Sequence, residues 1–368
     1  MTAAAVARIR SAALAHNLQR VRELAPASPV LAVVKANAYG HGLLETVAAL
    51  SNADAFAVAR FEAAISLRQA GVTKDIVVLS TVLDAQELAW AREFDLRFVV
   101  HSVAQVNSLV AAGEGAPLHV WLKIDTGMGR LGIHPEQFVT VLDQLSSLPY
   151  VADDICLMTH LACADEPESD MTARQLATFA ATIGDWDGDI SVANSAGILA
   201  WPEALGGGSL LSSSGRNWAR PGLMLYGVSP FADRSASDCG LQPVMTFEGR
   251  LLAVRHIPQG HSVGYAADWV ASRDTKVGVV NVGYADGYPW RLSNQSTVVV
   301  NGRIIPLIGR VSMDMISVDL SEAPEAQVGD TVVLWGEQPT VSELAAKLQT
   351  STYELLTGVG NRVQRIKA

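Results

Sequence analysis

A lysine stands at the end of a short apolar run near the start of the chain. The run, residues 30–34, follows Pro29 and is typical of a strand buried on both faces, as in parallel sheets. Burial lowers the pKa of Lys35, which is the state that a Schiff-base or general-base lysine needs. Tyr39 follows in a loop with two glycines, so a phenol could lie beside the amine. The alternative is a lysine whose ammonium simply reaches water.

A second group of ionisable residues follows near the middle of the chain. Lys123 and Asp125 stand two residues apart in an apolar run, which places both on one face of a strand. A glycine-rich turn then leads to Arg130. Taken alone, Lys123 and Asp125 could form a buried ion pair.

Three further polar residues occupy the ends of later apolar runs. His160 ends one run, Ser195 follows the next, and Arg220 precedes Gly222 and Leu223. In a barrel of parallel strands, such ends meet at one face, where active sites and phosphate groups are held. Alternatively, His160 is a core histidine, Ser195 an ordinary N-cap and Arg220 a surface arginine.

The elements that must position these residues follow an alternating pattern. Between residues 30 and 228, short apolar runs alternate with amphipathic stretches, as in βα units. The runs are 30–35, 55–59, 76–80, 97–100, 120–125, 155–161, 190–193, and 223–226 with the preceding 218–222. The helix candidates are 62–70, 84–94, 102–112, 135–145 and 171–183. Eight runs predict a (β/α)8 TIM-type barrel. An open doubly wound sheet would more naturally have a Gly-x-Gly-x-x-Gly turn after its first strand, and none follows the run at 30–35.

The pattern changes after residue 228. A turn-rich segment, 229–240, precedes short β-branched runs and one helix candidate, 340–348, with a capping-box sequence. The predicted runs are 249–256, 276–282, 296–300, 303–308, 317–320 and 331–335. We therefore predict an α/β barrel over residues 1–235 and a mostly-β C-terminal domain over residues 236–368.

Composition excludes several classes of function. The net charge of −10 and the absence of a Lys/Arg stripe argue against nucleic acid as a partner. The three cysteines form no CxxC pair, which fits a reducing compartment. No apolar segment is long enough to span a bilayer, and residues 1–10 lack a secretory pattern. We expect a cytoplasmic protein without a membrane partner, and predict no metal site.

Residues 32–42 closely resemble the pyridoxal-phosphate lysine motif of alanine racemases. The resemblance covers nearly the whole chain, through the segments 15–18, 121–132, 193–196, 220–223, 262–266, 282–287 and 309–314. It implies a barrel followed by a small β domain. It also implies that Lys35 holds pyridoxal 5'-phosphate as an internal aldimine and that Tyr39 reaches the phosphate.

The same resemblance implies further cofactor contacts. His160 would lie beside the cofactor ring, and Arg220 would donate to its pyridine nitrogen. Because an arginine cannot pass on its proton, that nitrogen would stay unprotonated and the cofactor would be a weaker electron sink. The phosphate would be bound by Ser195, Gly222 and Leu223.

For the substrate, the resemblance implies that Arg130 faces the carboxylate and the phenolic oxygen of the cofactor. Met313 would offer a backbone N–H to the same carboxylate, Tyr284 would narrow the entrance, and Asp314 would play a supporting part. Lys123 matches a lysine that is often carbamylated and bonded to the matching arginine.

The implied activity is the interconversion of L-alanine and D-alanine by two bases on an external aldimine. Lys35 would serve one face of Cα and Tyr265 the other. A phenol with a pKa of about 10 is a poor base, so Tyr265 needs positive charge, which a chain through His160 to Arg220 could supply. In the family, the C-terminal domain reaches the partner's barrel, which implies a head-to-tail homodimer with shared sites.

Other functions stay open. They are a broad-specificity or serine racemase, a decarboxylase on the same barrel, which would not need Tyr265, and a non-catalytic pyridoxal-phosphate carrier, which would lack residues 240–368.

Two residues depart from the family pattern. Asn361 stands where many relatives have a phosphate-contacting tyrosine, so cofactor retention or substrate range could differ. Ser312 stands where some have cysteine, with little expected consequence.

Overall fold

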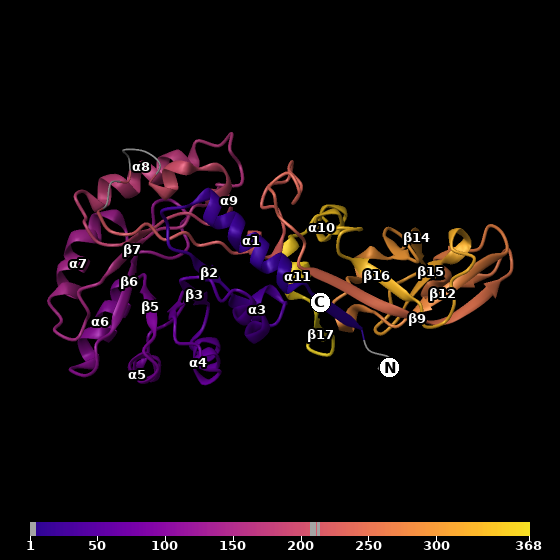
Figure 1. Cartoon of the computed structure of the whole chain (residues 1–368), viewed down its shortest axis with the longest axis horizontal. Helices are drawn as coiled ribbons and strands as arrows, with labels where there is room; N and C mark the ends of the chain where they lie inside the picture. Colours follow the sequence, from indigo (N-terminus) through magenta and orange to yellow (C-terminus); the bar gives the residue numbers. More distant parts are fainter. Residues whose placement is uncertain (1–4, 207–210, 212–213) are drawn as a thin grey trace.

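The chain forms an α/β part and a mostly-β part that lie end to end (Figure 1). The structure, a computed structural model, describes residues 5–206, 211 and 214–368. Residues 1–4 of the segment 1–10, which lacks a secretory pattern, therefore lie outside the described residues. In the described part of the chain, no helix is long and apolar enough to cross a membrane.

The α/β part is built on parallel strands that pair in chain order. Within the described residues these are β2 (Leu31–Val33), β3 (Ala55–Val58), β4 (Asp75–Val78), β5 (Arg97–Val100), β6 (His119–Lys123), β7 (Cys156–Met158) and β8 (Ile190–Ser191). Each falls within one of the predicted apolar runs or starts one residue before it. The strands are almost wholly buried, as expected for a sheet covered by helices.

The eighth predicted run differs from the prediction. Leu223–Tyr226 is a 3-10 helix (η3) and not a strand, because a buried apolar run fits either structure. The residues before it close the sheet instead. Ala219 forms a bridge to Val30, and Asn217 forms one to Ile190, so both edge strands are joined through residues 217–219. The barrel predicted from the sequence is thus confirmed, with a short irregular eighth segment.

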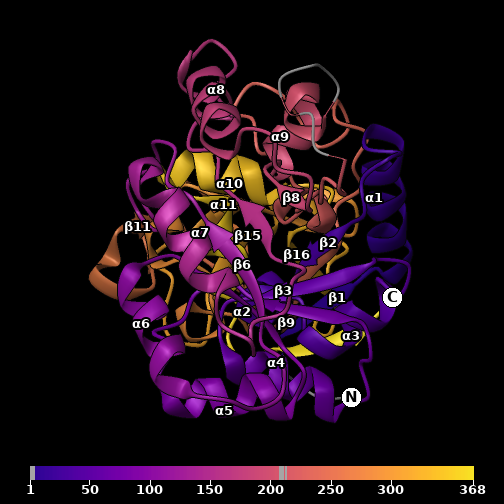
Figure 2. The ribbon, with the colours of Figure 1, turned by 90° about the vertical axis from the view of Figure 1, so that its left-hand side faces the viewer.

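Helices surround the barrel strands (Figure 2). They are α1 (Ser11–Leu24), α3 (Leu43–Ala49), α4 (Phe61–Gln69), α5 (Ala85–Glu93), α6 (Val103–Ala112), α7 (Phe138–Ser146), α8 (Met171–Ile183) and α9 (Ser195–Ala200), with the short turns α2 (Lys35–Tyr39), η1 (Pro135–Gln137) and η2 (Pro202–Leu205). The five helices predicted between the strands are all present. Local capping explains some of their boundaries, since the Asp84 carboxylate accepts the Glu87 N–H at 2.9 Å.

The mostly-β part contains an eight-stranded sheet with the order β12-β15-β14-β13-β16-β9-β1-β17 in the described residues. Its strands are β1 (Val6–Ile9), β9 (Met245–Ile257), β12 (Thr275–Val280), β13 (Thr297–Val300), β14 (Arg303–Ile308), β15 (Ile316–Asp319), β16 (Thr331–Trp335) and β17 (Gln364–Lys367). Because β9 also pairs with β12, a closed ring forms from the strands β12, β15, β14, β13, β16 and β9. β10 (Ser262–Val263) and β11 (Trp269–Val270) pair antiparallel as a separate two-stranded sheet.

Two helices and both chain ends join this sheet to the barrel. α10 (Val341–Leu348) has the predicted capping box, and α11 (Thr352–Thr357) follows it. The 3-10 turns η4 (Tyr265–Ala267), η5 (Tyr284–Asp286), η6 (Trp290–Leu292) and η7 (Leu320–Glu322) lie between the strands. β1 pairs with β9 and β17, so residues 6–9, assigned to the barrel by the sequence, lie in the C-terminal sheet. The division at residues 235 and 236 stays a prediction.

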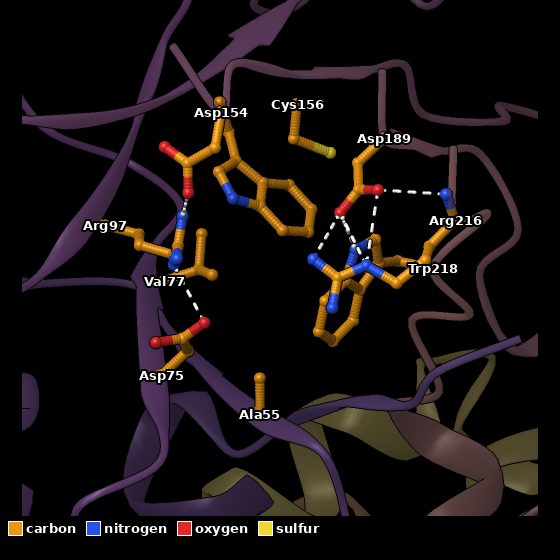
Figure 3. Close-up of a pocket in the computed structure, with 10 residues that line it drawn as sticks. Ala55, Asp75, Val77, Arg97, Asp154, Cys156, Asp189, Arg216 and Trp218 are labelled. Carbon is orange, nitrogen blue, oxygen red and sulfur yellow. Dashed lines mark hydrogen bonds and ion pairs between the residues drawn. The ribbon is translucent and has the colours of Figure 1, made fainter. Parts of the chain in front are cut away.

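Two ion-pair groups face each other at the amino-terminal end of the barrel (Figure 3). Arg97 contacts Asp75 at 2.9 Å and Asp154 at 2.7 Å. Asp189 accepts hydrogen bonds from the Arg216 backbone N–H and the Trp218 indole, each at 2.9 Å. This end lies opposite the face where barrel enzymes work, so these contacts serve stability.

Replacing Asp189 by alanine should lower the free energy of unfolding by about 1–3 kcal/mol, because two partly buried donors lose their acceptor. Burial alone would raise the pKa of Asp189, but hydrogen bonds from Arg216 and Trp218 outweigh it and hold the pKa below 3.8. The stabilisation is therefore present above pH 3.8 and is lost as the pH falls through the folded-state pKa. Urea unfolding at neutral pH and at a series of pH values below 3.8 should show the difference between the variant and wild type shrinking as the pH falls.

Candidate active site

A cavity of about 660 Å³ opens at the carboxyl ends of the barrel strands. Lys35 follows β2, Lys123 ends β6, and His160 follows β7. All the barrel residues singled out from the sequence line this cavity except Asp125: Lys35, Tyr39, Lys123, Arg130, His160, Ser195, Arg220, Gly222 and Leu223. The fold therefore brings together side chains that are up to 188 positions apart, from Lys35 to Leu223. Their individual roles stay predictions.

The loop that carries Lys35 has an unusual backbone. Residues 36–39 all have φ between 51° and 54°, so the turn labelled α2 is left-handed although it contains no glycine. Such a conformation costs about 1–2 kcal/mol per residue for an L-amino acid. Backbone strain of this kind persists only where the surrounding structure holds it, and it is concentrated at functional sites. The sequence predicted an open loop here but not its handedness.

The cavity is strongly cationic around Lys35. Burial, and then the charge of Arg130, lower the pKa of Lys35 below 10.5. Burial, Arg220 and Arg130 lower the pKa of Lys123 to about 8. Burial and Arg220 hold the pKa of His160 well below 6.5, so its imidazole is neutral at physiological pH. A site with this charge suits a ligand that carries phosphate and carboxylate groups.

Arg220 is buried with 4% of its surface exposed, which excludes a surface arginine. Its guanidinium donates to the Ser191 hydroxyl and the Thr159 carbonyl, each at 2.6 Å. It also lies 3.4 Å from His160 Nδ1, which leaves that nitrogen as an acceptor. Burial lowers the pKa of Arg220 to about 10, so the group remains charged at neutral pH. The orientation of His160 is thus tied to a fixed cation.

One end of the cavity gathers hydroxyl and backbone groups that suit a phosphate. The Ser195 hydroxyl accepts the N–H of Gly222 at 2.9 Å and that of Met224 at 3.3 Å. Asn194, and not Ser195, caps α9, because its side chain accepts the Gly197 N–H at 2.9 Å. A Cβ at Gly222 would lie 2.6 Å from the Tyr39 hydroxyl, so the glycine allows the phenol to reach this end.

Replacing Gly222 by alanine should displace Tyr39, because the added Cβ and the phenol oxygen cannot both fit. Overpacking of this kind costs about 1–3 kcal/mol of stability. We also expect weaker binding of a phosphate-bearing ligand, measured by titration of the stripped protein with pyridoxal phosphate. Gly71→Ala is the control for adding a methyl group, because a Cβ there would meet nothing within 4 Å. It does not control for backbone strain, because Gly71 has a positive φ. An unchanged affinity in Gly222→Ala would contradict this account of Tyr39.

Sequence reasoning missed Tyr353 and Asp165, which also line the cavity. Tyr353 lies on α11, and its ring centroid is 5.7 Å from that of Tyr39, which stacks on Tyr226 at 4.6 Å. Burial, followed by the charge of Asp165, raises the pKa of Tyr353. Asn361, the position noted for its departure from the family, is exposed and does not line the cavity. The C-terminal part therefore contributes a phenol through Tyr353 and not through position 361.

The predicted C-terminal site residues lie away from this cavity in the single chain. Tyr265 is 71% exposed and Met313 is 54% exposed, and Tyr284 is exposed as well. Asp314 accepts a hydrogen bond from Arg362 at 2.6 Å. None of the four lines the cavity described above.

Two family models match the chain over most of its length. The model described as alanine racemase, N-terminal domain, matches residues 9–230, and the model described as alanine racemase, C-terminal domain, matches residues 244–367. The chain belongs to the alanine racemase family. The resemblance stated from the motifs is therefore confirmed, and so is the class of enzyme, a racemase.

Relatives and solved structures agree with this assignment. Alanine racemase of Vibrio parahaemolyticus is 46% identical over 361 residues, covering 98% of each chain. The biosynthetic alanine racemase of Escherichia coli has the same identity and coverage. The crystal structure of biosynthetic alanine racemase from Pseudomonas aeruginosa is 42% identical, covers 100% of both chains and has a TM-score of 0.91. The predicted fold class, a barrel followed by a mostly-β domain, is thus confirmed.

Proposed function

We propose that the protein interconverts L-alanine and D-alanine with bound pyridoxal 5'-phosphate. The observation that carries this proposal is the cavity that Lys35 lines together with Tyr39, Ser195 and Gly222. An amine of lowered pKa suits an aldehyde, and hydroxyl and backbone groups suit a phosphate. The names of the relatives support alanine as the substrate.

In this proposal, the cofactor would be held by Lys35 at its aldehyde carbon and by Tyr39, Ser195, Gly222 and Leu223 at its phosphate. When bound, it would supply an electron sink for the Cα carbanion. Arg220, held by Ser191 and Thr159, donates hydrogen bonds but releases no proton, so it would leave the ring nitrogen unprotonated. Arg130 would orient the substrate carboxylate.

Lys35 would remove or deliver the proton on one face of Cα, and Tyr265 would do so on the other. Because Tyr265 is exposed and lies away from the cavity, we propose that it enters the site of a second copy of this chain. Met313 would then offer its backbone N–H to the carboxylate, and Tyr284 would narrow the entrance. This gives a head-to-tail homodimer, which we place in the cytoplasm, where the free cysteines would stay reduced.

Lys123 should be carbamylated in protein kept in bicarbonate buffer. A pKa of about 8 makes a neutral amine available, whose nitrogen bonds to the carbon of CO₂ and releases one proton. The resulting anion would offset the charges of Arg130 and Arg220. Carbon-13 NMR after incubation with labelled bicarbonate should show one carbamate signal that Lys123→Ala removes. A spectrum identical to that of the variant would rule out the modification.

The proposed activity is tested by chiral chromatography of the cofactor-loaded protein with L-alanine and, separately, with L-serine. We expect D-alanine to form with kcat/KM higher than for serine. Equal or better use of serine would favour the broader racemase. Release of CO₂ in step with substrate loss would favour a decarboxylase. Retention of the cofactor without any turnover would favour a carrier.

A further inference from the structure

Arg365 joins the lysine loop of the barrel to the end of the chain. It lies on β17, which stands with α11 at the junction of the two parts (Figure 1). Its Nε donates to the Gly40 carbonyl at 2.8 Å. Its other N–H groups donate to the carbonyls of Val359 at 2.8 Å, Val363 at 3.1 Å and Gly360 at 3.2 Å. One guanidinium therefore holds a loop of each part.

The lysine loop needs tertiary contacts of this kind. Its left-handed residues, 36–39, are followed by Gly40 with φ 81° and Gly42 with φ 99°. At Gly40, a Cβ would lie 2.0 Å from the Leu356 carbonyl oxygen, so the loop sits directly on α11. At Gly42, a Cβ would lie 3.7 Å from Arg365 Cδ, so the arginine stem packs there as well.

The loop also makes hydrogen bonds of its own. The Asn37 side chain accepts the Leu43 N–H at 2.8 Å, and the Gly40 N–H donates to the Ala36 carbonyl at 3.0 Å. These bonds define the turn internally, but neither fixes it relative to the C-terminal part. Arg365 does so, because its donors reach both parts at once.

We propose that Arg365 is a positioning residue that holds the Lys35–Tyr39 turn in its left-handed form and thereby sets the affinity for the cofactor. The inference rests on the proposed function, since it assigns Lys35 and Tyr39 to the two ends of pyridoxal phosphate. Lysine cannot replace Arg365 fully, because a single ammonium on a flexible stem does not offer the planar fork that spans these carbonyls.

The chain offers a matched control in Arg68, on α4. Arg68 also donates to backbone carbonyls only, those of Phe94 at 2.9 Å, Val72 and Lys74 at 2.7 Å, and Asp95 at 2.8 Å. These acceptors precede β4 and β5, at the end of the barrel opposite the cavity. Replacing Arg68 should therefore remove similar hydrogen bonds to backbone carbonyls without changing any contact of the lysine loop.

The test compares wild type with Arg365→Ala, Arg365→Lys and Arg68→Ala as full-length protein. The cofactor is removed, and the dissociation constant for added pyridoxal phosphate is measured by absorbance. We expect Arg365→Ala to bind it about tenfold to hundredfold more weakly, Arg365→Lys to fall between, and Arg68→Ala to match wild type. Hydrogen exchange of the stripped proteins should be faster at residues 35–43 in Arg365→Ala alone.

Two results would overturn the inference. One is wild-type affinity together with wild-type exchange at residues 35–43 in Arg365→Ala. The other is an equal loss of affinity in Arg68→Ala, which would reduce the effect to general stability. If the wild-type chain binds no pyridoxal phosphate, the proposed function fails, whereas the exchange measurement still decides whether Arg365 holds the loop.

Discussion

Replacing Lys35 by alanine should lower kcat by at least about 10⁴-fold, because one residue is asked both to hold the cofactor and to act as a base. The variant should also lose the absorbance of the lysine-bound cofactor. Lys123 lies in the same cavity, but its amine extends from the end of β6 and not from the left-handed turn. We therefore expect no substitution of one lysine for the other.

The control for Lys35→Ala is Lys74→Ala, which removes a lysine that donates to the Ser51 and Ala53 carbonyls away from the cavity. It should keep wild-type turnover and absorbance. Steady-state kinetics and absorbance spectra of both variants give the comparison. Turnover within tenfold of wild type in Lys35→Ala would contradict the assigned role.

Replacing Tyr265 by phenylalanine should lower kcat by about 10²–10⁴-fold in both directions, the range for loss of a general acid–base group. The cofactor should remain bound, because the residues proposed to hold it, Lys35 at one end and the Tyr39 and Ser195 group at the other, are unchanged. Tyr150→Phe is a matched control, since its phenol donates to the Leu109 carbonyl on α6 at 2.8 Å, away from the cavity. That variant should lose some stability and keep its turnover.

Mixing the two inactive variants tests whether the site is shared. In a dimer of one Lys35→Ala chain and one Tyr265→Phe chain, one site carries both changes and the other carries neither. Random mixing should therefore restore about a quarter of wild-type activity, if each site takes Tyr265 from its partner. Activity that stays at the level of the single variants after subunit exchange would exclude the proposed shared site.

The sequence predicted the barrel well because its buried parallel strands are short apolar runs that alternate with amphipathic helices. It could not separate a buried 3-10 turn from a strand at residues 223–226, since both are apolar. The pairing of β1 with β17 joins the two ends of the chain, and no local pattern indicates it. Composition alone would have suggested glycines for positive φ, so the left-handed Ala36 and Tyr39 were not predictable.

The candidate site was also predicted only in part from the sequence. Motif residues at strand ends predicted which barrel side chains meet in the cavity. Tyr353 was missed because it lies on a short helix of the C-terminal part, without a strand end to mark it. Tyr265 lies outside the cavity of its own chain, so its proposed role requires a second copy, which a single sequence implies only through its family.

The account is tested most directly by incubating cofactor-loaded protein with L-alanine in deuterium oxide. Both enantiomers are followed by chiral chromatography, and the Cα proton is followed by NMR. Two bases on opposite faces predict that D-alanine appears with deuterium at Cα. Exchange at Cα without D-alanine would contradict the second base, and the absence of any exchange while the lysine-bound cofactor persists would contradict alanine as the substrate.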